Sequence, residues 1–329
     1  MSNYYLVLNG EFAYNKSTSD GYPFGAVKRL DLYEKGVLST LYIVFTPKKE
    51  QQINSDFLTV FFDTDRWHRG VAERAAEGAR NHGLLNISAE DFFDIDLSVP
   101  KDVAEQKQIG AFICQLDNLI TLHQRKYEKL HNIKKSMLEK MFPKNGSNVP
   151  EIRFKGFTEA WEQRKLGDVV QITMGQSPDG STYSDEPSDY ILVQGNADLQ
   201  NGWVCPRIWT TQITKKADAG DLIMSVRAPA GAMGKTAYNA VIGRGVAAIK
   251  GNEFIYQLLV KMDADGFWKT LSCGSTFESL NSDNIKNVEV KIPTTAEQIK
   301  IGGYFQLLDN LITLHQRKPN IYTGGYYAE

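Results

Sequence analysis

The eleven residues LDNLITLHQRK occupy positions 116–126 and recur unchanged at positions 308–318, an offset of 308 − 116 = 192 positions. Each copy follows a Glu-Gln-x-x-Ile-Gly sequence, which itself follows a strand-like segment that ends in proline. These flanking features lie at 94–100 (DIDLSVP) and 105–110 before the first copy, and at 287–293 (NVEVKIP) and 297–302 before the second. Chance does not produce such a repeat. The chain is therefore a tandem of two similar units, each a globular segment followed by a near-constant helix.

The first copy lies in a segment with coiled-coil periodicity. Apolar residues recur at steps of four and three between residues 109 and 141, and this spacing predicts a long helix with an apolar seam. Only His123 and Lys134 break the seam, and a single polar residue there more often sets the register of a helix pair than binds a ligand. A helix over residues 105–142, ended by Pro143, would be about 57 Å long at 1.5 Å per residue.

The second copy repeats the seam but stops earlier, because Pro319 cannot continue a helix. We predict that residues 109–141 and 301–318 form an antiparallel pair with His123 and His315 near the seam. The alternative is that each helix packs only on its own domain. Since the second helix is the shorter one, the end of the first is expected to expose apolar residues through which the chain self-associates. Those residues are Leu130, Ile133, Met137 and Met141.

The composition gives no sign of a general polyanion binder or of a membrane protein. The 37 Lys and Arg residues nearly balance the 39 Asp and Glu residues, so the formal net charge is −2. Three scattered cysteines provide neither a disulfide framework nor a CxxC metal site, which is typical of a reducing compartment. No secretory signal and no run of eighteen apolar residues is present. These features predict a soluble, cytoplasmic protein without a membrane partner.

The globular segments predict an α+β fold. Between residues 149 and 296, short apolar runs alternate with Gly, Pro, Asn and Asp, and one helical segment lies near residues 254–271. We predict two mixed α/β globular domains joined by long coiled-coil helices that form an antiparallel pair. The predicted boundaries are 1–104 for the first domain, 105–148 for the central helix and linker, 149–296 for the second domain and 297–329 for the second helix.

Three sequence elements together resemble the specificity (S) subunits of Type I restriction-modification systems. They are IRFKGFTEAWEQRKLGDV at 152–169, the IP-x-x-x-EQ-x-x-I junction that begins at 292, and the central helix that ends in KKSMLEKMFP. The resemblance covers essentially the whole chain. It implies a non-enzymatic DNA reader without a cofactor of its own, in which two target-recognition domains each read half of a bipartite sequence and the helices set the distance between them.

The resemblance also implies the partners. They are double-stranded DNA, two methyltransferase (M) subunits that bring S-adenosylmethionine, and restriction (R) subunits that join for cleavage. The chain departs from the family pattern in one respect, because nothing like residues 152–169 precedes the first unit. We therefore expect a first domain that holds only the later part of a recognition domain, and a second helix that is shortened at Pro319.

Base reading needs planar amides and guanidinium groups on loops, beside Lys, Ser, Thr and backbone N–H groups that hold phosphate. Two stretches, 220–236 in the second unit and 10–28 in the first, are interpreted as the same strand–loop element. For any single residue here the alternative is an ordinary solvated loop side chain. The candidate DNA-binding residues are Gln176, Ser177, Gln194, Asn196, Ser225, Arg227, Lys235, Thr236 and Arg244 in the second unit, and Asn15, Lys16 and Ser17 in the first.

Enzyme signatures are weak. GAMGKT at 231–236 ends like a phosphate-binding loop, but Pro229 occupies the position of its first glycine and has no N–H to donate. Glu289 and Lys291 have the spacing of a nuclease pair without the accompanying acidic residue nearby, and no His or Cys cluster predicts a metal site. The rival hypothesis is a coiled-coil scaffold that binds only protein. The two differ in whether Arg227, Lys235, Arg244 and Lys16 converge on one positive face.

Overall fold

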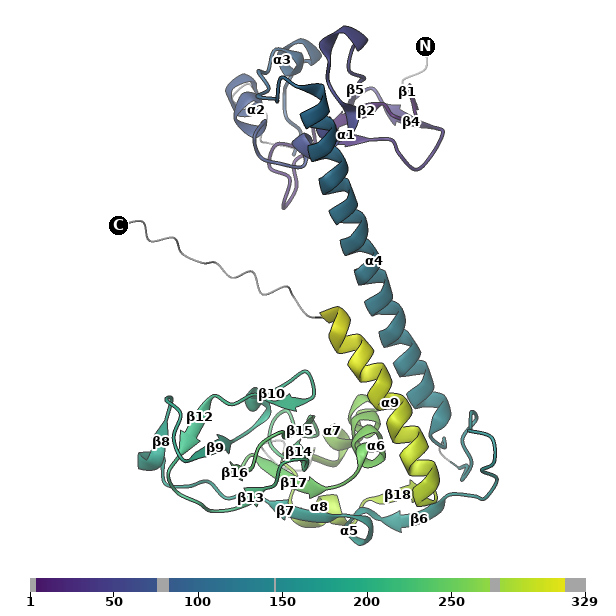
Figure 1. Cartoon of the computed structure of the whole chain (residues 1–329), viewed down its shortest axis with the longest axis vertical. Coiled ribbons are helices and arrows are strands. Elements are labelled where there is room, and N and C mark those ends of the chain that lie inside the picture. The colour runs from purple at the N-terminus through teal and green to yellow at the C-terminus, as the bar shows by residue number, and fades with distance from the viewer. Residues whose placement is uncertain (1–3, 76–82, 145, 273–278, 317–329) are drawn as a thin grey trace. The chain divides into compact units, whose positions relative to one another are not determined.

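A computed structural model describes residues 4–75, 83–144, 146–272 and 279–316 of the chain (Figure 1). The chain forms two compact units, Met1–His123 (unit 1) and Gln124–Glu329 (unit 2), which divide within helix α4. The elements of unit 1 are β1 (Tyr4–Leu8), β2 (Phe12–Asn15), β3 (Ala26–Arg29), β4 (Lys35–Ser39), β5 (Ile43–Phe45), η1 (Lys49–Gln51), α1 (Ser55–Phe62), α2 (His68–Arg74), α3 (Ala89–Phe93) and the first part of α4 (Val103–Met141).

Unit 2 contains the end of α4 and a larger set of strands. Its elements are β6 (Glu162–Lys165), α5 (Leu166–Val169), β7 (Gln171–Met174), η3 (Gly180–Thr182), β8 (Tyr183–Ser184), β9 (Tyr190–Val193), η4 (Asn196–Asp198), β10 (Leu199–Gln200), β11 (Trp203–Val204), β12 (Ile208–Thr210), β13 (Lys216–Ala217), β14 (Leu222–Ser225), β15 (Met233–Lys235), β16 (Ala240–Ile242), β17 (Val246–Lys250), α6 (Glu253–Ala264), α7 (Phe267–Ser272), α8 (Ser282–Lys286), β18 (Glu289–Ile292) and α9 (Thr295–Gln316). The mixed α/β fold class is confirmed. A six-stranded sheet (β10-β11-β15-β14-β17-β7) and a five-stranded sheet (β13-β16-β9-β12-β8) form its body.

The two units share one substructure, which confirms that residues 10–28 and 220–236 form the same element. In unit 1 strand β2 pairs with β3 on one side and β5 on the other, and in unit 2 strand β14 pairs with β15 and β17 in the same way. The residue two positions after each of the strands β2 and β14 makes the same long-range link. Ser17 bridges to Leu84 in unit 1, and Arg227 bridges to Ser279 in unit 2.

The glycine of each Glu-Gln-x-x-Ile-Gly sequence lies where the long helix crosses the first turn of a helix of the domain, α1 in unit 1 and α6 in unit 2. A Cβ at Gly110 would lie 2.5 Å from the Phe57 nitrogen in α1, and a Cβ at Gly302 would lie 2.9 Å from the Phe254 nitrogen in α6. Both distances are too short for any side chain, so only glycine permits this approach. The repeat in the sequence therefore encodes the same helix crossing twice.

Helix α9 and the last part of α4 form an antiparallel pair within unit 2 (Figure 1). Lys134 of α4 contacts Asp309 of α9 at 2.5 Å, while Phe142, further along α4, stacks near Phe305, which is earlier in α9. The pair is thus confirmed. Since residues after Asp309 lie opposite residues before Lys134, the two LDNLITLHQRK copies are not aligned with each other. His315 is half-buried, whereas His123 is exposed and belongs to unit 1.

The prediction that residues 130–141 expose an apolar seam is wrong. Leu130, Ile133 and Met137 pack against the core of unit 2, and Met141 is 4% exposed. The physical reason is the register of the pair: Lys134 lies opposite Asp309, so α9 runs beside the end of α4, and the core of unit 2 covers the same residues. The exposed apolar side chains of α4 lie earlier, at Phe112, Leu116, Leu119, Ile120 and Leu122.

One predicted strand does not form. Residues 287–293 contain strand β18, which pairs with β6, but the matching segment 94–100 has no strand partner among the described residues and is irregular. A strand is stable only when its backbone groups find partners. No described helix combines the length and the apolar character that crossing a membrane would require.

Candidate nucleic-acid interface

Three loops of unit 2 meet at the ends of strands β7, β9 and β16. They contain Gln176 and Ser177, Gln194, and Arg244 respectively. The backbone N–H of Gln176 donates to the Ile242 carbonyl at 2.9 Å, and the N–H of Arg244 donates to the Ser177 hydroxyl at 3.1 Å. The structure therefore brings together predicted residues that lie up to 68 positions apart (244 − 176 = 68).

Glycines allow these loops to approach closely. A Cβ at Gly175 would lie 2.1 Å from the Gly243 carbonyl oxygen, and a Cβ at Gly245 would lie 2.0 Å from the Gln194 carbonyl oxygen. Larger residues would push the loops apart. The close packing holds the backbone of a polar loop cluster in place without covering the side chains, of which Gln176 and Arg244 are exposed.

Arg227 joins the same cluster from strand β14. The N–H of Val226 donates to the Gly245 carbonyl at 2.8 Å, so the residue after Val226 lies beside the loop that carries Arg244. Arg227 is exposed, and no described carboxylate pairs with either arginine. The two arginines thus come from adjacent loops of the same cluster. Asn196, also exposed, follows Gln194 in the same region.

Two lysines near this cluster were not among the predicted contact residues. Lys215 and Lys216 are exposed, and the Lys215 carbonyl accepts from the N–H of Ile242, the residue whose carbonyl binds Gln176. Thr214 donates its hydroxyl proton to the Gln176 carbonyl. The sequence contains Thr-Lys-Lys at 214–216. Two adjacent surface lysines are common in any sequence, so only the fold, which places them beside other candidate contact residues, makes them stand out.

Three of the predicted residues are used inside unit 2 instead. Lys235 lies at the other end of β14 from Arg227, where it pairs with Glu253 at 2.9 Å and lies over the rings of Trp203 and Tyr256. Its side chain is only 13% exposed. Ser225 and Thr236 are buried, and their hydroxyl groups donate to the backbone carbonyls of nearby loop residues. The polar groups of all three are thus engaged by partners within unit 2. Lys235 therefore does not converge with Arg227 and Arg244.

Lys235 belongs to a polar chain that runs to the helix pair. Glu253, which binds Lys235, also accepts from the Gln257 amide at 2.8 Å, and Gln257 donates to Asp309 at the same distance. Asp309 in turn pairs with Lys134, the polar residue that interrupts the seam of α4. Gln257 is fully buried. A buried polar chain of this kind selects one register of the two helices, because a shifted pairing would leave its members without partners.

In unit 1 the predicted residues lie on the hairpin after β2. Asn15 accepts the N–H of Ser17 at 3.0 Å, and Lys16 is half-buried with its ammonium 3.3 Å from the Ile87 carbonyl. Ser17 is exposed. Asn15 and Lys16 therefore make local structural contacts, and their contact with DNA remains a prediction, as it does for the set in unit 2.

The enzyme-like motifs of the sequence have structural roles in the described part of the chain. Residues 231–235 lead into strand β15 instead of a loop before a helix, so they cannot form a phosphate-binding loop. Glu289 accepts from Gln163 of the neighbouring strand, and Lys291 donates to the Lys144 and Ser147 carbonyls. No group of three His, Cys, Asp or Glu side chains in these residues could hold a metal ion.

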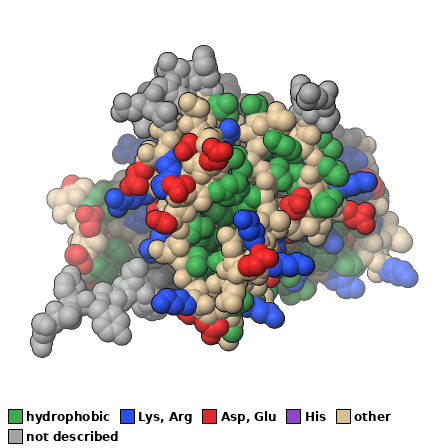
Figure 2. All heavy atoms as spheres, turned by 90° about the horizontal axis from the view of Figure 1, so that it is seen from above, with side chains coloured by type: hydrophobic (Ala, Val, Ile, Leu, Met, Phe, Trp, Pro, Cys, Tyr) green, Lys and Arg blue, Asp and Glu red, His purple; other side chains and the backbone are tan. Residues whose placement is uncertain are grey.

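The charges on the surface are mixed. Figure 2 shows one face on which basic and acidic side chains are interspersed around exposed apolar ones. No field of one sign covers that face, which agrees with the formal net charge of −2. An attraction to DNA would therefore come from local sites such as the Arg227 and Arg244 loops.

A family model described as "Type I restriction modification DNA specificity domain" matches residues 31–132 and 158–321. The chain belongs to this family. The first range lies mostly in unit 1 and includes α4 as far as residue 132, the second lies in unit 2 and includes α9, and together they cover most of the chain. Membership agrees with the α/β sheets and the paired helices described above.

Similar proteins carry the same description. The chain is 30% identical over 263 residues to the "Putative type I restriction enzyme MjaX specificity subunit" of Methanocaldococcus jannaschii, with 76% of this chain and 60% of that protein covered. It is 22% identical over 318 residues to the MjaVIII specificity subunit of the same organism, with 87% and 71% covered. The chain thus spans about 60% of the length of the first of these relatives.

Solved structures share the fold. The Type I restriction-modification S subunit from M. genitalium gives a TM-score of 0.59 at 14% identity, with 94% of this chain and 78% of that chain covered. The HsdS subunit from Thermoanaerobacter tengcongensis gives 0.51 at 21% identity, with 95% and 76% covered. Both similarities concern the arrangement of sheets and long helices.

Proposed function

We propose that the chain is a non-catalytic, sequence-specific DNA-binding subunit of a Type I restriction-modification complex, and that unit 2 reads one half of a bipartite target. The observation that carries the proposal is the convergence of three loops at Arg244, Gln176 and Gln194, with Arg227 beside them. Guanidinium and amide side chains on a rigid backbone are the groups that read base edges. Family membership supports double-stranded DNA as the ligand.

The other subunits would dock on the helices. The exposed apolar side chains of α4 between Phe112 and Leu122 have no cover among the described residues, and Ile299, Leu307, Leu311 and Leu314 of α9 are similarly exposed. Exposed apolar surface of this extent usually marks a protein-binding surface. We assign it to the methyltransferase subunits, with the restriction subunits joining the resulting complex. The alternative is that two copies of the chain associate through this surface.

The decisive test is DNA binding by the chain in complex with its methyltransferase subunit. A random DNA library selected by the complex should yield a defined target sequence. Arg244→Ala and Arg227→Ala should each relax the preference at one base pair, with a loss of about 1 to 3 kcal/mol in binding free energy. Arg164→Ala, at an exposed position of strand β6, is the matched control and should leave the target unchanged.

Lys235→Ala distinguishes a residue that stabilises the interior of unit 2 from a residue that contacts DNA. Because Lys235 is held by Glu253 and two aromatic rings, its loss should destabilise unit 2 and leave base preference intact. Unchanged affinity for both arginine variants at low salt would contradict the interface. Absence of any selected sequence, with intact association to the methyltransferase, would favour a protein-binding scaffold.

A further inference from the structure

Four neighbouring strands of the five-stranded sheet bring loop residues to one end of that sheet. Their order is β13, β16, β9 and β12. Strands β16 and β9 are parallel and finish at this end, whereas β13 and β12 are antiparallel to their neighbours and start there. The end therefore carries Arg244 shortly after β16, Gln194 directly after β9 and Arg207 directly before β12. Arg207 was not among the predicted contact residues.

A buried carboxylate holds Arg207 beside Gln194. Asp198 is 3% exposed, and its Oδ1 accepts hydrogen bonds from the Nε and Nη2 of Arg207 at 3.0 and 2.8 Å. The other oxygen, Oδ2, accepts the backbone N–H groups of Gln194 at 2.7 Å and of Gly195 at 3.2 Å. One carboxylate group thus fixes both the guanidinium of Arg207 and the backbone of a candidate base-reading residue.

The pairing leaves part of the guanidinium available to a ligand. An arginine has five N–H donors, and Asp198 uses one on Nε and one on Nη2. No described residue accepts a hydrogen bond from Nη1, and 48% of the Arg207 side chain is exposed. The remaining donors on Nη1 and Nη2 lie in one plane and match the O6 and N7 acceptors of guanine. Because Asp198 already restricts the side chain, less conformational freedom is lost on binding.

A purely structural ion pair would explain only part of this arrangement. The loop has other bonds, since the Asp198 N–H donates to the Gly195 carbonyl at 3.0 Å and the Asp198 carbonyl accepts the Cys205 N–H at 2.8 Å. A buried carboxylate does need a positive charge nearby, and Arg207 supplies it. A lysine would supply the same charge, but it has no planar pair of donors for a base edge. The difference between these two side chains therefore separates the structural role from base reading.

We propose that Arg207 is a further base-reading residue of unit 2 and that Asp198 positions it together with Gln194. The proposal rests on the proposed function, because it takes this end of the sheet to face a DNA half-site. Arg207 and Arg244 lie two strands apart, or about 10 Å at roughly 4.8 Å per strand, which is the rise of about three base pairs. The two arginines would therefore read different base pairs of one half-site, with guanine opposite Arg207.

The test is selection of a random DNA library by the chain in complex with its methyltransferase subunit. Arg207→Lys keeps a charge for Asp198 but loses the planar donors, so it should relax the preference for guanine at one base pair and weaken binding of the selected target roughly tenfold. Thermal stability and the base pair that responds to Arg244→Ala should not change. Lys250→Met is the control, because Lys250 pairs with Asp218 and its side chain is 49% exposed. This control should leave the target unchanged.

Asp198→Asn tests the positioning role. An amide replaces one of the two carboxylate oxygens by a donor, so the group can no longer hold both the guanidinium and the two backbone N–H groups. The preference should therefore relax at two base pairs together, the one assigned to Arg207 and the one that responds to Gln194→Ala. A role in stability alone would not change base preference at two defined positions.

Three outcomes would overturn the proposal. The first is an Arg207→Lys complex that selects the unchanged target, which would make the pair with Asp198 structural. The second is an equal loss of affinity for all sequences, which would make Arg207 a phosphate contact. In both cases, a target that Arg244→Ala alters would leave the proposed function intact. The third is an unaltered complex that selects no target, which would refute the proposed function as well.

Discussion

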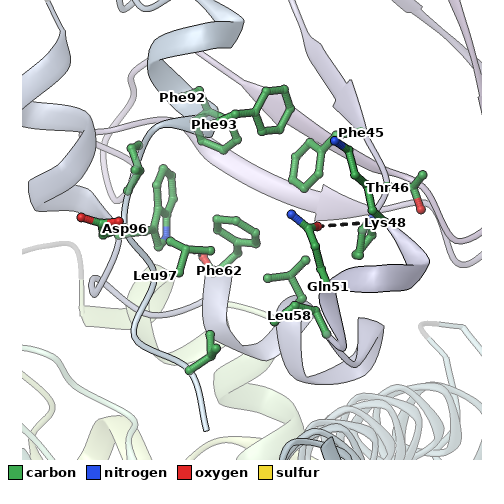
Figure 3. Close-up of a pocket in the computed structure, with 15 residues that line it drawn as sticks. Phe45, Thr46, Lys48, Gln51, Leu58, Phe62, Phe92, Phe93, Asp96 and Leu97 are labelled. Carbon is green, nitrogen blue, oxygen red and sulfur yellow. Dashed lines mark hydrogen bonds between the residues drawn. The ribbon is translucent and has the colours of Figure 1, made fainter. Parts of the chain in front are cut away.

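Units 1 and 2 contain the same hairpin, the same domain helix and the same crossing by a long helix, but they differ in what covers them. In unit 2, residues 161–174, which we call the cover segment, pair with both strand β17 and strand β18. In unit 1, the corresponding strand β5 and segment 95–99 border a cavity (Figure 3). Among the described residues of unit 1, the hairpin, the domain helix and the helix crossing form although no strand pairs with the free side of β5 or with segment 94–100. The cover decides whether the surrounding apolar residues form a closed core.

The largest expected effect comes from removing the side chain of Trp161, the buried residue at the start of the cover segment in unit 2. Trp161 packs against Phe142 and Phe254, so Trp161→Ala should lower the free energy of unfolding of unit 2 by about 3 to 5 kcal/mol. Hydrogen exchange should rise in β6, β7 and β18 and stay unchanged in unit 1. Trp203→Ala, at a position that is 47% exposed, is the control with a much smaller effect. If Trp161→Ala and Trp203→Ala lowered the free energy of unfolding equally, the cover segment would not be what completes the core of unit 2.

The second prediction concerns the two parts of α4. Leu130→Lys with Met137→Lys should destabilise unit 2 by several kcal/mol, because each side chain packs on the core and a buried apolar residue contributes about 1.5 to 3 kcal/mol. Leu119→Lys with Leu122→Lys should leave thermal stability nearly unchanged and should weaken association with the methyltransferase or with a second copy. Differential scanning calorimetry and sedimentation measure the two outcomes. If instead Leu130→Lys with Met137→Lys weakened association and left stability unchanged, the exposed apolar residues of α4 would lie at 130–141.

The third prediction tests the equivalence of the two helix crossings. Gly110→Ala and Gly302→Ala should each destabilise their own unit by about 1 to 3 kcal/mol, since the added methyl group meets the backbone of α1 or α6. Gly303→Ala, one residue further in α9, meets nothing within 4 Å and should be neutral or stabilising. Local hydrogen exchange assigns each effect to its unit. If one of the two substitutions is harmless, the crossings are not equivalent.

The smallest effect is a pH dependence in unit 1. Burial raises the pKa of Tyr14 above its ordinary value of 10.0, and its hydroxyl donates to the Phe24 carbonyl at 2.8 Å. Above pH 10 the unfolded chain loses a proton that folded Tyr14 retains, so the free energy of unfolding falls as pH rises, by at most about 1.4 kcal/mol per pH unit. Tyr14→Phe should flatten this slope in denaturant titrations. Tyr22→Phe, at an exposed position, should not change it, and an unchanged slope for both would contradict the assignment to Tyr14.

Much of the architecture followed from local patterns. The exact repeat at 116–126 and 308–318 predicted two related units, and the heptad spacing predicted both long helices and their antiparallel pairing, because helix periodicity and helix ends depend on residues a few positions apart. The loop residues Gln176, Gln194, Arg227 and Arg244 could be selected as loop polar groups. Their convergence could not be derived, since the glycine contacts that bring the loops together join residues from different strands.

Tertiary partners decided the rest. Segments 94–100 and 287–293 have the same pattern, yet only the second forms a strand, because only there does β6 satisfy its backbone. The sequence predicted Lys235 to contact phosphate, but its ammonium pairs with Glu253 of helix α6, which comes later in the chain. Leu130 and Met137 were expected to be exposed, but the register of α9 along α4 and the core of unit 2 cover them. Strand pairing, ion pairing and burial each depend on groups that are distant in the chain, and their positions exist only once the fold has formed.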